Sequence, residues 1–501
     1  MHEVLNALHR HAAATPDKIA LSDGAETLDY ATLARRVWGA AAQLRALPSP
    51  DGAGDPVIGL AGGNRVDWVV GQLAAWQAGL TAVPLPPFFS PDQTRHILRD
   101  AGVTHVLTAA DAAGFPGVVT LRLAPILASA PPPPKAGAEI AQIIYTSGST
   151  GTPKGVCLGD DQLAWTAGAL ANAVNAGPDD HYLSAVPLAL LLETLCAIAV
   201  PLLAGGRVTL APSLTDGFGT GDRPPLAATV AATRPTCLVL VPHLLALWVE
   251  ELTRTAGATP DSLRVVAVGG AAVPPALARR AWNLGIPVYE GYGLSECCSV
   301  VSLNRPGARR AETAGPPLPG LAVSINGGEI IVAGPPVMRG YLHAKPHRAK
   351  GPGVWRTGDH GSLNADGYLT VHGRLDTIIV TPWGRNVSPE WIESLVLGDP
   401  RVGLCLLTGG PDMELALLLA PSTAGRPWFD TATPAQVEAL INECCATVPA
   451  YARPRRHAVV PLADLFHRGL LTGNGRIRRR EAAAAYRFVL APTHSTAQAL
   501  P

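Results

Sequence analysis

The sequence predicts an α/β protein with a large N-terminal domain and a small C-terminal domain. From Leu28 to about residue 120, helical stretches alternate with short apolar strands, the pattern of stacked βα units. Beyond about Asp376 the sequence is Arg-rich and contains no lysine. A chain of 501 residues with 48% hydrophobic side chains can form several cores. We therefore expect domains over residues 1–375 and 376–490, followed by an unstructured tail over residues 491–501.

The elements of the alternating segment follow from their hydrophobic spacing. The stretch YATLARRVWGAAAQLRAL predicts a helix, whereas PVIGLA, TAVPL and THVLT predict short buried strands. Residues 125–138 contain successive prolines, which remove hydrogen-bond donors and fix an extended backbone, so they predict a spacer. A further apolar strand begins the next segment, AQIIYTSGSTG.

The rest of the chain contains the same mixture of elements. We expect a helical segment around residues 188–203, a loop over residues 211–225, a helix in HLLALWVEEL, and strands in TCLVLV and LRVVAVGG. In the C-terminal domain, IIVTP, GLCLLTG and ELALLLA predict strands, and a helix is expected near residues 436–445. The small domain is therefore predicted to be α+β.

Charge and cysteine content argue against several classes of protein. The 39 Lys and Arg residues balance 39 Asp and Glu residues, so the chain has no overall attraction to nucleic acid or to an anionic membrane. We see no signal peptide and no membrane span, and we expect a cytoplasmic protein without a nucleic-acid partner. The 8 cysteines show no CxxC spacing, which predicts neither a disulfide framework nor a zinc site.

A loop suited to phosphate follows the strand at Ile143. The segment IIYTSGSTGTPKGV combines glycines, hydroxyl side chains and Lys154, so backbone amides, hydroxyls and one cation can surround phosphate groups. It is not a Walker loop, because Gly155 follows Lys154 where that motif has Ser or Thr after a GK pair. A polar turn without a ligand is the alternative interpretation.

The segment TSGSTGTPKG resembles the signature of the acyl-adenylate-forming superfamily, which contains acyl-CoA synthetases, peptide-synthetase adenylation domains and luciferases. The segments LDYATLARRV, QAGLTAVPL, LRVVAVGGAAV, VYEGYGLSE, WRTGDHG, GRLDTIIVTPWGRNVSPEWIE and LTGNGRIRR resemble further family motifs, in the family's order. The resemblance spans about Leu28 to Arg480. It implies a multi-subdomain N-terminal domain with mixed sheets flanked by helices, and a mobile α+β C-terminal domain. It also implies ATP, AMP and CoA as ligands, with Mg²⁺ as cofactor.

The resemblance also implies roles for individual residues. Lys154, Glu296 and Arg476 would be catalytic, and Glu296 would bind Mg²⁺ through its carboxylate. Tyr292 would stack on adenine and Asp359 would accept the ribose hydroxyls. The nucleotide-binding residues that it implies are Thr146, Ser147, Gly148, Ser149, Thr150, Gly151, Gly269, Gly270, Ala271, Glu290, Gly291, Tyr292, Gly293, Ser295, Asp359 and Arg374.

Three smaller groups of residues complete the implied site. They are Leu190 and Leu191 in the acyl pocket, Asp376 at the hinge between the domains, and Gly384, Arg385 and Asn386 in the CoA tunnel. The tunnel would form once the small domain has rotated.

One departure from the family pattern bears on the reaction. The family's last motif presents a lysine within an NGK sequence, and LTGNGRIRR has Arg476 there. In the family that lysine bridges the carboxylate substrate and the α-phosphate, a role that a longer, planar, forked guanidinium fills poorly. No lysine follows Lys350 to replace it. Compositional preference for Arg is the alternative explanation, because the chain has only five lysines.

A second departure concerns the acid. VPLALLLETL resembles the PLAHxxE stretch of long-chain acyl-CoA synthetases, with Leu190 where His or an aromatic residue is usual. Leucine there suggests a wider or more apolar pocket, although a plain core helix has the same composition. No Asp lies within residues 184–196 to pair with a substrate ammonium, which disfavours α-amino acids. A hydrophobic carboxylic acid is expected.

These observations favour an acid–thiol ligase that forms an acyl-CoA thioester through acyl-AMP. The substitution at Arg476 predicts weak adenylation, so the enzyme would act mainly on acyl-adenylate supplied by a separate adenylating ligase. A complete ATP-dependent synthetase is the first alternative, and a non-catalytic nucleotide-binding relative is the second. The phosphopantetheine of a carrier protein is an alternative acceptor to CoA.

Overall fold

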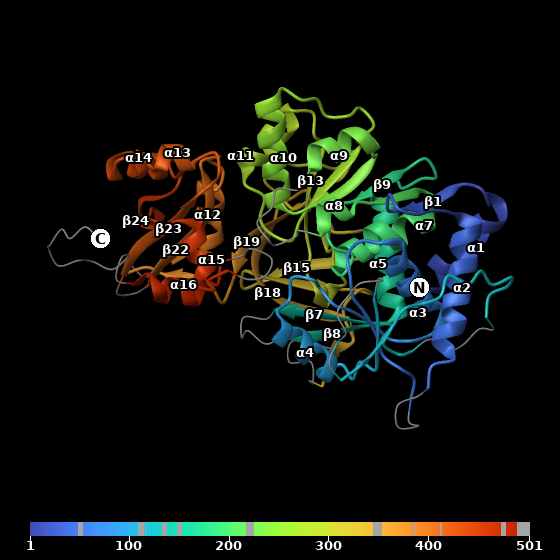
Figure 1. Ribbon diagram of the computed structural model, residues 1–501. Coiled ribbons are helices and arrows are strands. Elements are labelled where there is room, and N and C mark those ends of the chain that lie inside the picture. The colour runs from blue at the N-terminus through green and yellow to red at the C-terminus, as the bar shows by residue number, and fades with distance from the viewer. Residues whose placement is uncertain are drawn as a thin grey trace.

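The computed structural model describes residues 1–48, 54–108, 115, 117–132, 138–147, 153–216, 225–343, 353–382, 385–410, 413–471 and 477–487. Figure 1 shows a large N-terminal body of sheets and helices, with a smaller C-terminal body beside it. The predicted fold class is confirmed: the chain is α/β, with mixed sheets flanked by helices and a smaller C-terminal part. In the described part of the chain no helix has both the length and the apolarity needed to cross a membrane.

One sheet of the N-terminal body has seven strands in the order β17-β8-β7-β4-β3-β5-β6. Its strands are β3 (Ile58–Leu60), β4 (Ala82–Pro84), β5 (His105–Leu107), β6 (Val119–Leu121), β7 (Gln142–Ser147), β8 (Pro153–Leu158) and β17 (Gly340–Tyr341). The strands from β6 to β7 are parallel, whereas β8 is antiparallel to both β7 and β17. The sheet is therefore mixed, and its antiparallel edge carries Lys154.

A second sheet has eight strands in the order β14-β13-β12-β11-β9-β10-β1-β2. Its strands are β1 (Ile19–Ser22), β2 (Thr27–Asp29), β9 (His181–Ser184), β10 (Arg207–Leu210), β11 (Cys237–Leu240), β12 (Val265–Val268), β13 (Val288–Tyr292) and β14 (Ser302–Leu303). The six central strands are parallel. Parallel strands end at one edge of a sheet, so the residues that follow β12 and β13 lie together.

Helices fill the space between and outside these sheets. Those of the N-terminal body are α1 (His2–Ala14), α2 (Tyr30–Arg45), α3 (Val66–Ala78), α4 (Pro91–Asp100), α5 (Asp160–Ala173), α6 (Leu191–Thr194), η2 (Leu195–Ala199), α7 (Val200–Ala204), α8 (Pro212–Thr215), α9 (Leu226–Thr233), α10 (Pro242–Thr255), α11 (Pro275–Asn283) and η3 (Ser295–Cys297). The largest core joins α1, α2, α3, α5 and α7 to both sheets. A separate core packs α8 to α11 on the other face of the eight-stranded sheet.

The predicted loop over residues 211–225 is partly wrong, because it begins with the short helix α8. Pro212 occupies the first helical turn, where its fixed φ suits the helix and its missing N–H leaves no bond unmade. The other expected elements of this region are present. The helical segment around residues 188–203 comprises α6, the π-helical η2 and α7, and HLLALWVEEL forms most of α10.

The remaining sheets lead into the C-terminal body. A four-stranded antiparallel sheet contains β15 (Ala322–Asn326), β16 (Glu329–Ala333), β18 (Val354–Leu363) and β19 (Leu369–Arg374). The C-terminal strands are β20 (Ile379–Val380), β21 (Asn386–Val387), β22 (Val402–Gly410), β23 (Met413–Pro421) and β24 (Arg456–Val459). The helices are α12 (Pro389–Val396), α13 (Arg426–Phe429), α14 (Pro434–Cys444), η4 (Ala450–Ala452), α15 (Leu462–His467) and α16 (Arg479–Ala485). The expected strands correspond to β20, β22 and β23, and the expected helix to α14. The predicted tail, residues 491–501, lies outside the described residues.

Candidate functional site

The two arms of the phosphate loop are antiparallel neighbours in the seven-stranded sheet. Thr146 on β7 pairs with Lys154 on β8, and Ser147 pairs with Pro153. A Cβ atom at Gly155 would lie 2.9 Å from Ile143 Cγ2, so the close approach of the two strands beside Lys154 requires glycine. The predicted residues between the arms, Gly148, Ser149, Thr150 and Gly151, lie outside the described residues.

Tyr341 lies close to both Lys154 and Glu296. The Tyr341 hydroxyl donates a hydrogen bond of 2.6 Å to Glu296 Oε1, and Lys154 Nζ lies 5.9 Å from the centroid of the Tyr341 ring. Strand β17 fixes this position, because Tyr341 pairs with Val156 two residues beyond Lys154. Tyr341 is not among the predicted site residues; the signal for it is its place in the segment GEIIVAGPPVMRGYL, which resembles a further family motif.

The carboxylate of Glu296 fits the role predicted for a Mg²⁺ ligand. Its Oε2 accepts no hydrogen bond from the described residues, so an oxygen donor is open to a hard cation. Within the same part of the chain, no group of three or more His, Cys, Asp or Glu side chains could hold a metal. The other ligands would therefore be phosphate oxygens and water, as is usual for Mg²⁺ bound with a nucleotide.

The residues predicted to hold the nucleotide base and α-phosphate line one cleft. They are Gly269, Gly270, Ala271, Glu290, Gly291, Tyr292, Gly293 and Ser295, and Asp359 and Arg374 line the same cleft. They converge because β12 and β13 are parallel neighbours with their carboxyl ends at the same edge. A Cβ atom at Gly293 would lie 1.6 Å from the Ser299 carbonyl oxygen, so the turn after Tyr292 admits only glycine.

Asp359 joins Tyr292 to Arg374. The Tyr292 hydroxyl donates to Asp359 Oδ2 at 2.5 Å, and Arg374 Nη1 donates to Asp359 Oδ1 at 3.1 Å. Burial raises the pKa of Asp359, and the bonds from Tyr292 and Arg374 oppose that rise only in part. Arg374 Nε also donates to Asp376 Oδ1 at 3.2 Å, so the predicted ribose ligand and the predicted hinge residue are linked through one guanidinium.

Glu290 lies deeper in the same wall. Its carboxylate is buried beside Asn304, whose amide nitrogen lies 3.4 Å from Glu290 Oε2, and its pKa is raised mainly by burial. The Asn304 backbone N–H donates to the Glu290 carbonyl oxygen at 2.9 Å. These bonds hold β13 and its glutamate at the cleft in a fixed orientation.

Leu190 and Leu191 line the cleft where α6 begins, as the predicted acyl pocket requires. Behind them the fully buried carboxyl of Glu193 accepts hydrogen bonds from the Tyr182 hydroxyl at 2.8 Å and from Ser184 Oγ at 2.6 Å. Burial raises the pKa of Glu193 to about 8. Glu193 is not among the predicted site residues, although it is the one charged residue within VPLALLLETL.

The structure does not bring the predicted CoA residues to this cleft. Arg385 and Asn386 are exposed at β21, which pairs with β20, and neither lines the cleft. Gly384 and Arg476 lie outside the described residues. Leu471 and Ile477, which flank the segment containing Arg476, do line the cleft. Arg479 from the same end of the chain is held by Glu393, with bonds of 2.6 and 2.8 Å.

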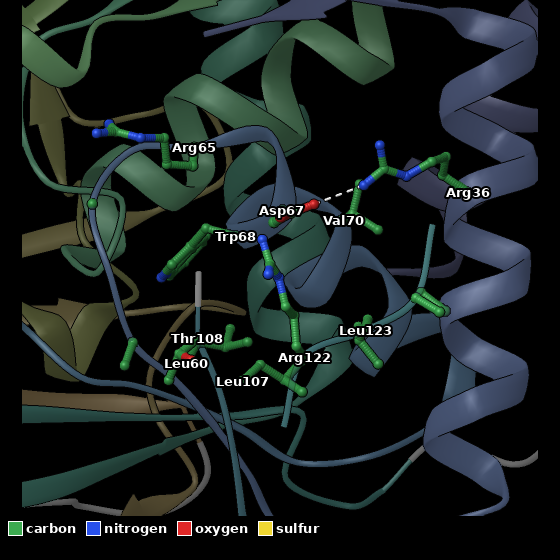
Figure 2. A pocket seen from close by; sticks show the side chains of 14 residues that line it. Arg36, Leu60, Arg65, Asp67, Trp68, Val70, Leu107, Thr108, Arg122 and Leu123 are labelled. Carbon is green, nitrogen blue, oxygen red and sulfur yellow. Dashed lines mark hydrogen bonds and ion pairs between the residues drawn. The ribbon is translucent and has the colours of Figure 1, made fainter. Parts of the chain in front are cut away.

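A second, smaller pocket lies apart from the predicted site. Figure 2 shows it between α2, α3 and the ends of β3 and β5, with the Arg122 guanidinium directed toward Asp67. Its other arginines are paired: Arg36 with Asp67 at 2.7 Å, and Arg65 with Asp216 at 2.9 Å. No residue predicted for the site lines this pocket.

Comparison with protein families matches nearly the whole chain. Residues 8–342 match the model described as "AMP-binding enzyme", and residues 376–494 match "AMP-binding enzyme C-terminal domain". Among curated proteins, a feruloyl-CoA synthase of Amycolatopsis sp is 31% identical over 80% of this chain and 84% of its own. An indoleacetate–CoA ligase of Aromatoleum aromaticum is 30% identical over 82% and 86% of the two chains.

Solved structures show the same fold over nearly the whole length. An o-succinylbenzoate coenzyme A synthetase of Bacillus subtilis, in complex with AMP, has a TM-score of 0.79 at 24% identity and covers 95% of this chain and 97% of its own. An anthranilate CoA ligase in complex with anthranoyl-AMP has a TM-score of 0.82 at 20% identity and covers 96% of each chain. With the cleft and its residues in place, these matches show that the chain belongs to the AMP-binding enzyme family and is related to its acyl-CoA ligases.

Proposed function

We propose that the enzyme joins a hydrophobic carboxylic acid to CoA through an acyl-adenylate, and that it acts mainly in the second of the two half-reactions. The carrying observation is that Asp359 and Arg374 line a cleft that reaches the apolar wall at Leu190, while Glu296, next to Ser295 in that cleft, contacts Tyr341 beside Lys154. A nucleotide and an apolar acid can thus be held side by side.

In the first half-reaction, a carboxylate oxygen of the acid attacks the α-phosphorus of ATP and pyrophosphate leaves. Lys154 would contact the phosphates from β8, and Ser295 would orient the α-phosphate. Glu296 would hold Mg²⁺, which neutralises phosphate charge when bound. Asp359 would accept both ribose hydroxyls, and Arg374 keeps its carboxylate oriented. Fixing the nucleotide in this way lowers the barrier mainly by positioning.

In the second half-reaction, the CoA thiolate attacks the acyl carbonyl carbon, and AMP leaves with the electron pair of the carbon–oxygen bond. We place the CoA tunnel at Gly384, Arg385 and Asn386, which would reach the cleft after the C-terminal domain rotates about Asp376. Arg385 and Asn386, at the start of β21, are exposed and so accessible to such a contact. AMP is already a good leaving group, so this step needs no cation from the LTGNGRIRR segment.

The presence of arginine at position 476 is the reason to expect weak adenylation with thioester formation retained. The adenylation step needs one compact cation between the acid carboxylate and the α-phosphate, and a forked guanidinium suits that geometry poorly. The enzyme would then draw acyl-adenylate from a separate adenylating ligase. A complete synthetase is the second candidate, favoured by the curated relatives, whose names describe CoA ligases and synthases. Intact Lys154, Glu296, Asp359 and Arg374 argue against a non-catalytic relative.

The proposal is tested by pyrophosphate exchange with a panel of hydrophobic acids, on wild type and on Arg476→Lys. We expect little exchange in wild type and a gain of about tenfold or more in the variant, because the ammonium restores a stabilising contact in the transition state. Arg480→Lys is the matched control, an exposed position in the same basic segment, and should leave exchange unchanged. Strong exchange in wild type would favour the complete synthetase.

A further inference from the structure

The cleft does not end at Leu190 but continues along the eight-stranded sheet toward its opposite edge. Two rows of side chains form this wall. Val239 on β11 pairs with Ala267 on β12, and one row deeper Cys237 pairs with both Tyr182 on β9 and Val265 on β12. These residues alternate along their strands, so all of them face the same side of the sheet.

Helices form the facing wall. Its lining residues are Leu170, Val174, Cys196, Val200 and Ala204, from α5 and its end, η2 and α7. Cys196 and Ala267 keep exposed surface although each lies in the middle of an element inside the domain, because each faces the open channel. Burial, Glu193 and Cys237 all raise the pKa of Cys196.

An ion pair lies at the far end of the apolar lining. Arg264 Nε donates to Asp180 Oδ1 at 2.7 Å, and both residues line the channel where β9 and β12 begin. Cys237 Sγ lies 3.9 Å from the same Asp180 oxygen, so the apolar section stops just above the pair. From Gly269 to Arg264 the strand advances five residues, or roughly 16 Å at about 3.3 Å per residue.

We infer that this channel takes the extended aliphatic chain of a medium-chain acid, with the end of the chain near Cys237. The inference rests on the proposed function and adds the shape and length of the acid. The side chains that line the channel offer methyl, methylene and thiol groups to a ligand. The Tyr182 hydroxyl already donates a hydrogen bond to Glu193. An apolar chain therefore leaves no polar group unpaired, whereas a polar tail would be desolvated without partners.

Depth along the channel then sets which acids are accepted. Ala267 and Cys237 lie in successive rows about 7 Å apart, the advance of two strand residues. A phenyl ring at Ala267 would block the channel near the nucleotide, and one at Cys237 would block only its end. Ala267→Phe should therefore exclude medium and long chains, and Cys237→Phe only the longest.

The test measures thioester formation from CoA and the synthetic adenylates of butyrate, octanoate, dodecanoate, hexadecanoate and ferulate. Supplied adenylates bypass the adenylation step, and rates are normalised to butyryl-adenylate, whose chain is too short to reach Cys237. We expect wild type to favour octanoate and dodecanoate over hexadecanoate, because an extended hexadecanoate chain is longer than a channel of roughly 16 Å. Ala267→Phe should lower the relative rate from octanoate upward, and Cys237→Phe only from dodecanoate upward, each by about tenfold or more.

The matched control is Cys444→Phe, which adds the same ring at a partly buried cysteine of α14 that does not line the cleft. Its profile should match that of wild type. Thioester formation by wild type from the butyrate and ferulate adenylates alone would overturn the channel inference and leave the proposed function standing. The same conclusion would follow if Ala267→Phe and Cys237→Phe limited the accepted chain length equally. Absence of thioester with every adenylate would instead overturn the proposed function.

Discussion

At the scale of single residues, the site depends on polar groups that hydrogen-bond to one another around the buried carboxylate of Asp359. Tyr292 and Arg374 both donate to Asp359, and Tyr341 donates to Glu296. Removing one donor leaves a buried acceptor short of a partner, which costs more than the bond contributed. These contacts therefore offer sharper tests than changes to exposed residues.

Tyr292→Phe should weaken AMP binding. The substitution removes the 2.5 Å hydrogen bond to a carboxylate whose pKa burial already raises, so its pKa would rise further and Asp359 would accept ribose hydroxyls less well. A loss of about 1–2 kcal/mol, or roughly tenfold in affinity, is expected by calorimetric titration. Tyr368→Phe is the control, because that ring faces Arg310 rather than the cleft. Equal affinity in wild type and Tyr292→Phe would contradict this role.

Glu193 should make the enzyme less stable as pH rises. Its pKa is about 8 in the folded protein against 4.5 for a free side chain, so between these values the folded state holds a proton that the unfolded state has released. Stability should fall with pH across that window and level off above it. Glu193→Gln mimics the protonated acid and should flatten this slope in thermal unfolding. A slope that survives the substitution would assign the effect to another group.

At the scale of elements, the β7–β8 pair places Lys154. Gly155→Ala should lower the unfolding temperature, because the new Cβ would lie 2.9 Å from Ile143 Cγ2 and 3.1 Å from Tyr145 Cζ. The matched substitution Gly168→Ala, in the middle of α5, meets nothing within 4 Å and should raise it, since alanine favours a helix by about 1 kcal/mol over glycine. If both variants change the unfolding temperature by the same amount and in the same direction, the crowding at Gly155 is refuted.

The sequence predicted elements better than the contacts between them. Local hydrophobic spacing was enough for β20, β22, β23, α10 and α14, and the family motifs marked the residues around β12 and β13. Tyr341 and Glu193 were missed because their roles depend on partners 45 and 11 residues away, and no local pattern encodes such contacts. The helix α8 is not predicted from the sequence, because Pro212 and the glycines that follow it are typical of a loop.

At the scale of the whole molecule, the proposed function requires different positions of the C-terminal body for the two half-reactions. Arg385 and Asn386 lie away from the cleft, whereas Leu471 and Ile477 line it. The structure has Leu471 and Ile477 at the cleft, and under the proposed function rotation would bring the β20–β21 hairpin to it. Figure 1 shows β19 between the two bodies, next to the predicted hinge at Asp376.

Asp376→Pro should slow the second half-reaction selectively, because a fixed φ restricts rotation at the hinge. We expect thioester formation from acyl-AMP and CoA to fall by about tenfold or more, with AMP affinity retained. Asp376→Ala is the control, since it removes the 3.2 Å hydrogen bond from Arg374 without restricting φ at the hinge. If Ala and Pro reduce the thioester rate equally, the bond rather than the rotation is responsible.

The central claim is most directly tested by comparing two rates of acyl-CoA formation in wild type with the same acid. One reaction contains the acid, ATP, Mg²⁺ and CoA, and the other contains the synthetic acyl-adenylate and CoA. We predict that the second is faster by about a hundredfold or more, equivalent to about 3 kcal/mol in barrier height. Equal rates would show that Arg476 supports adenylation and that the enzyme is a complete synthetase.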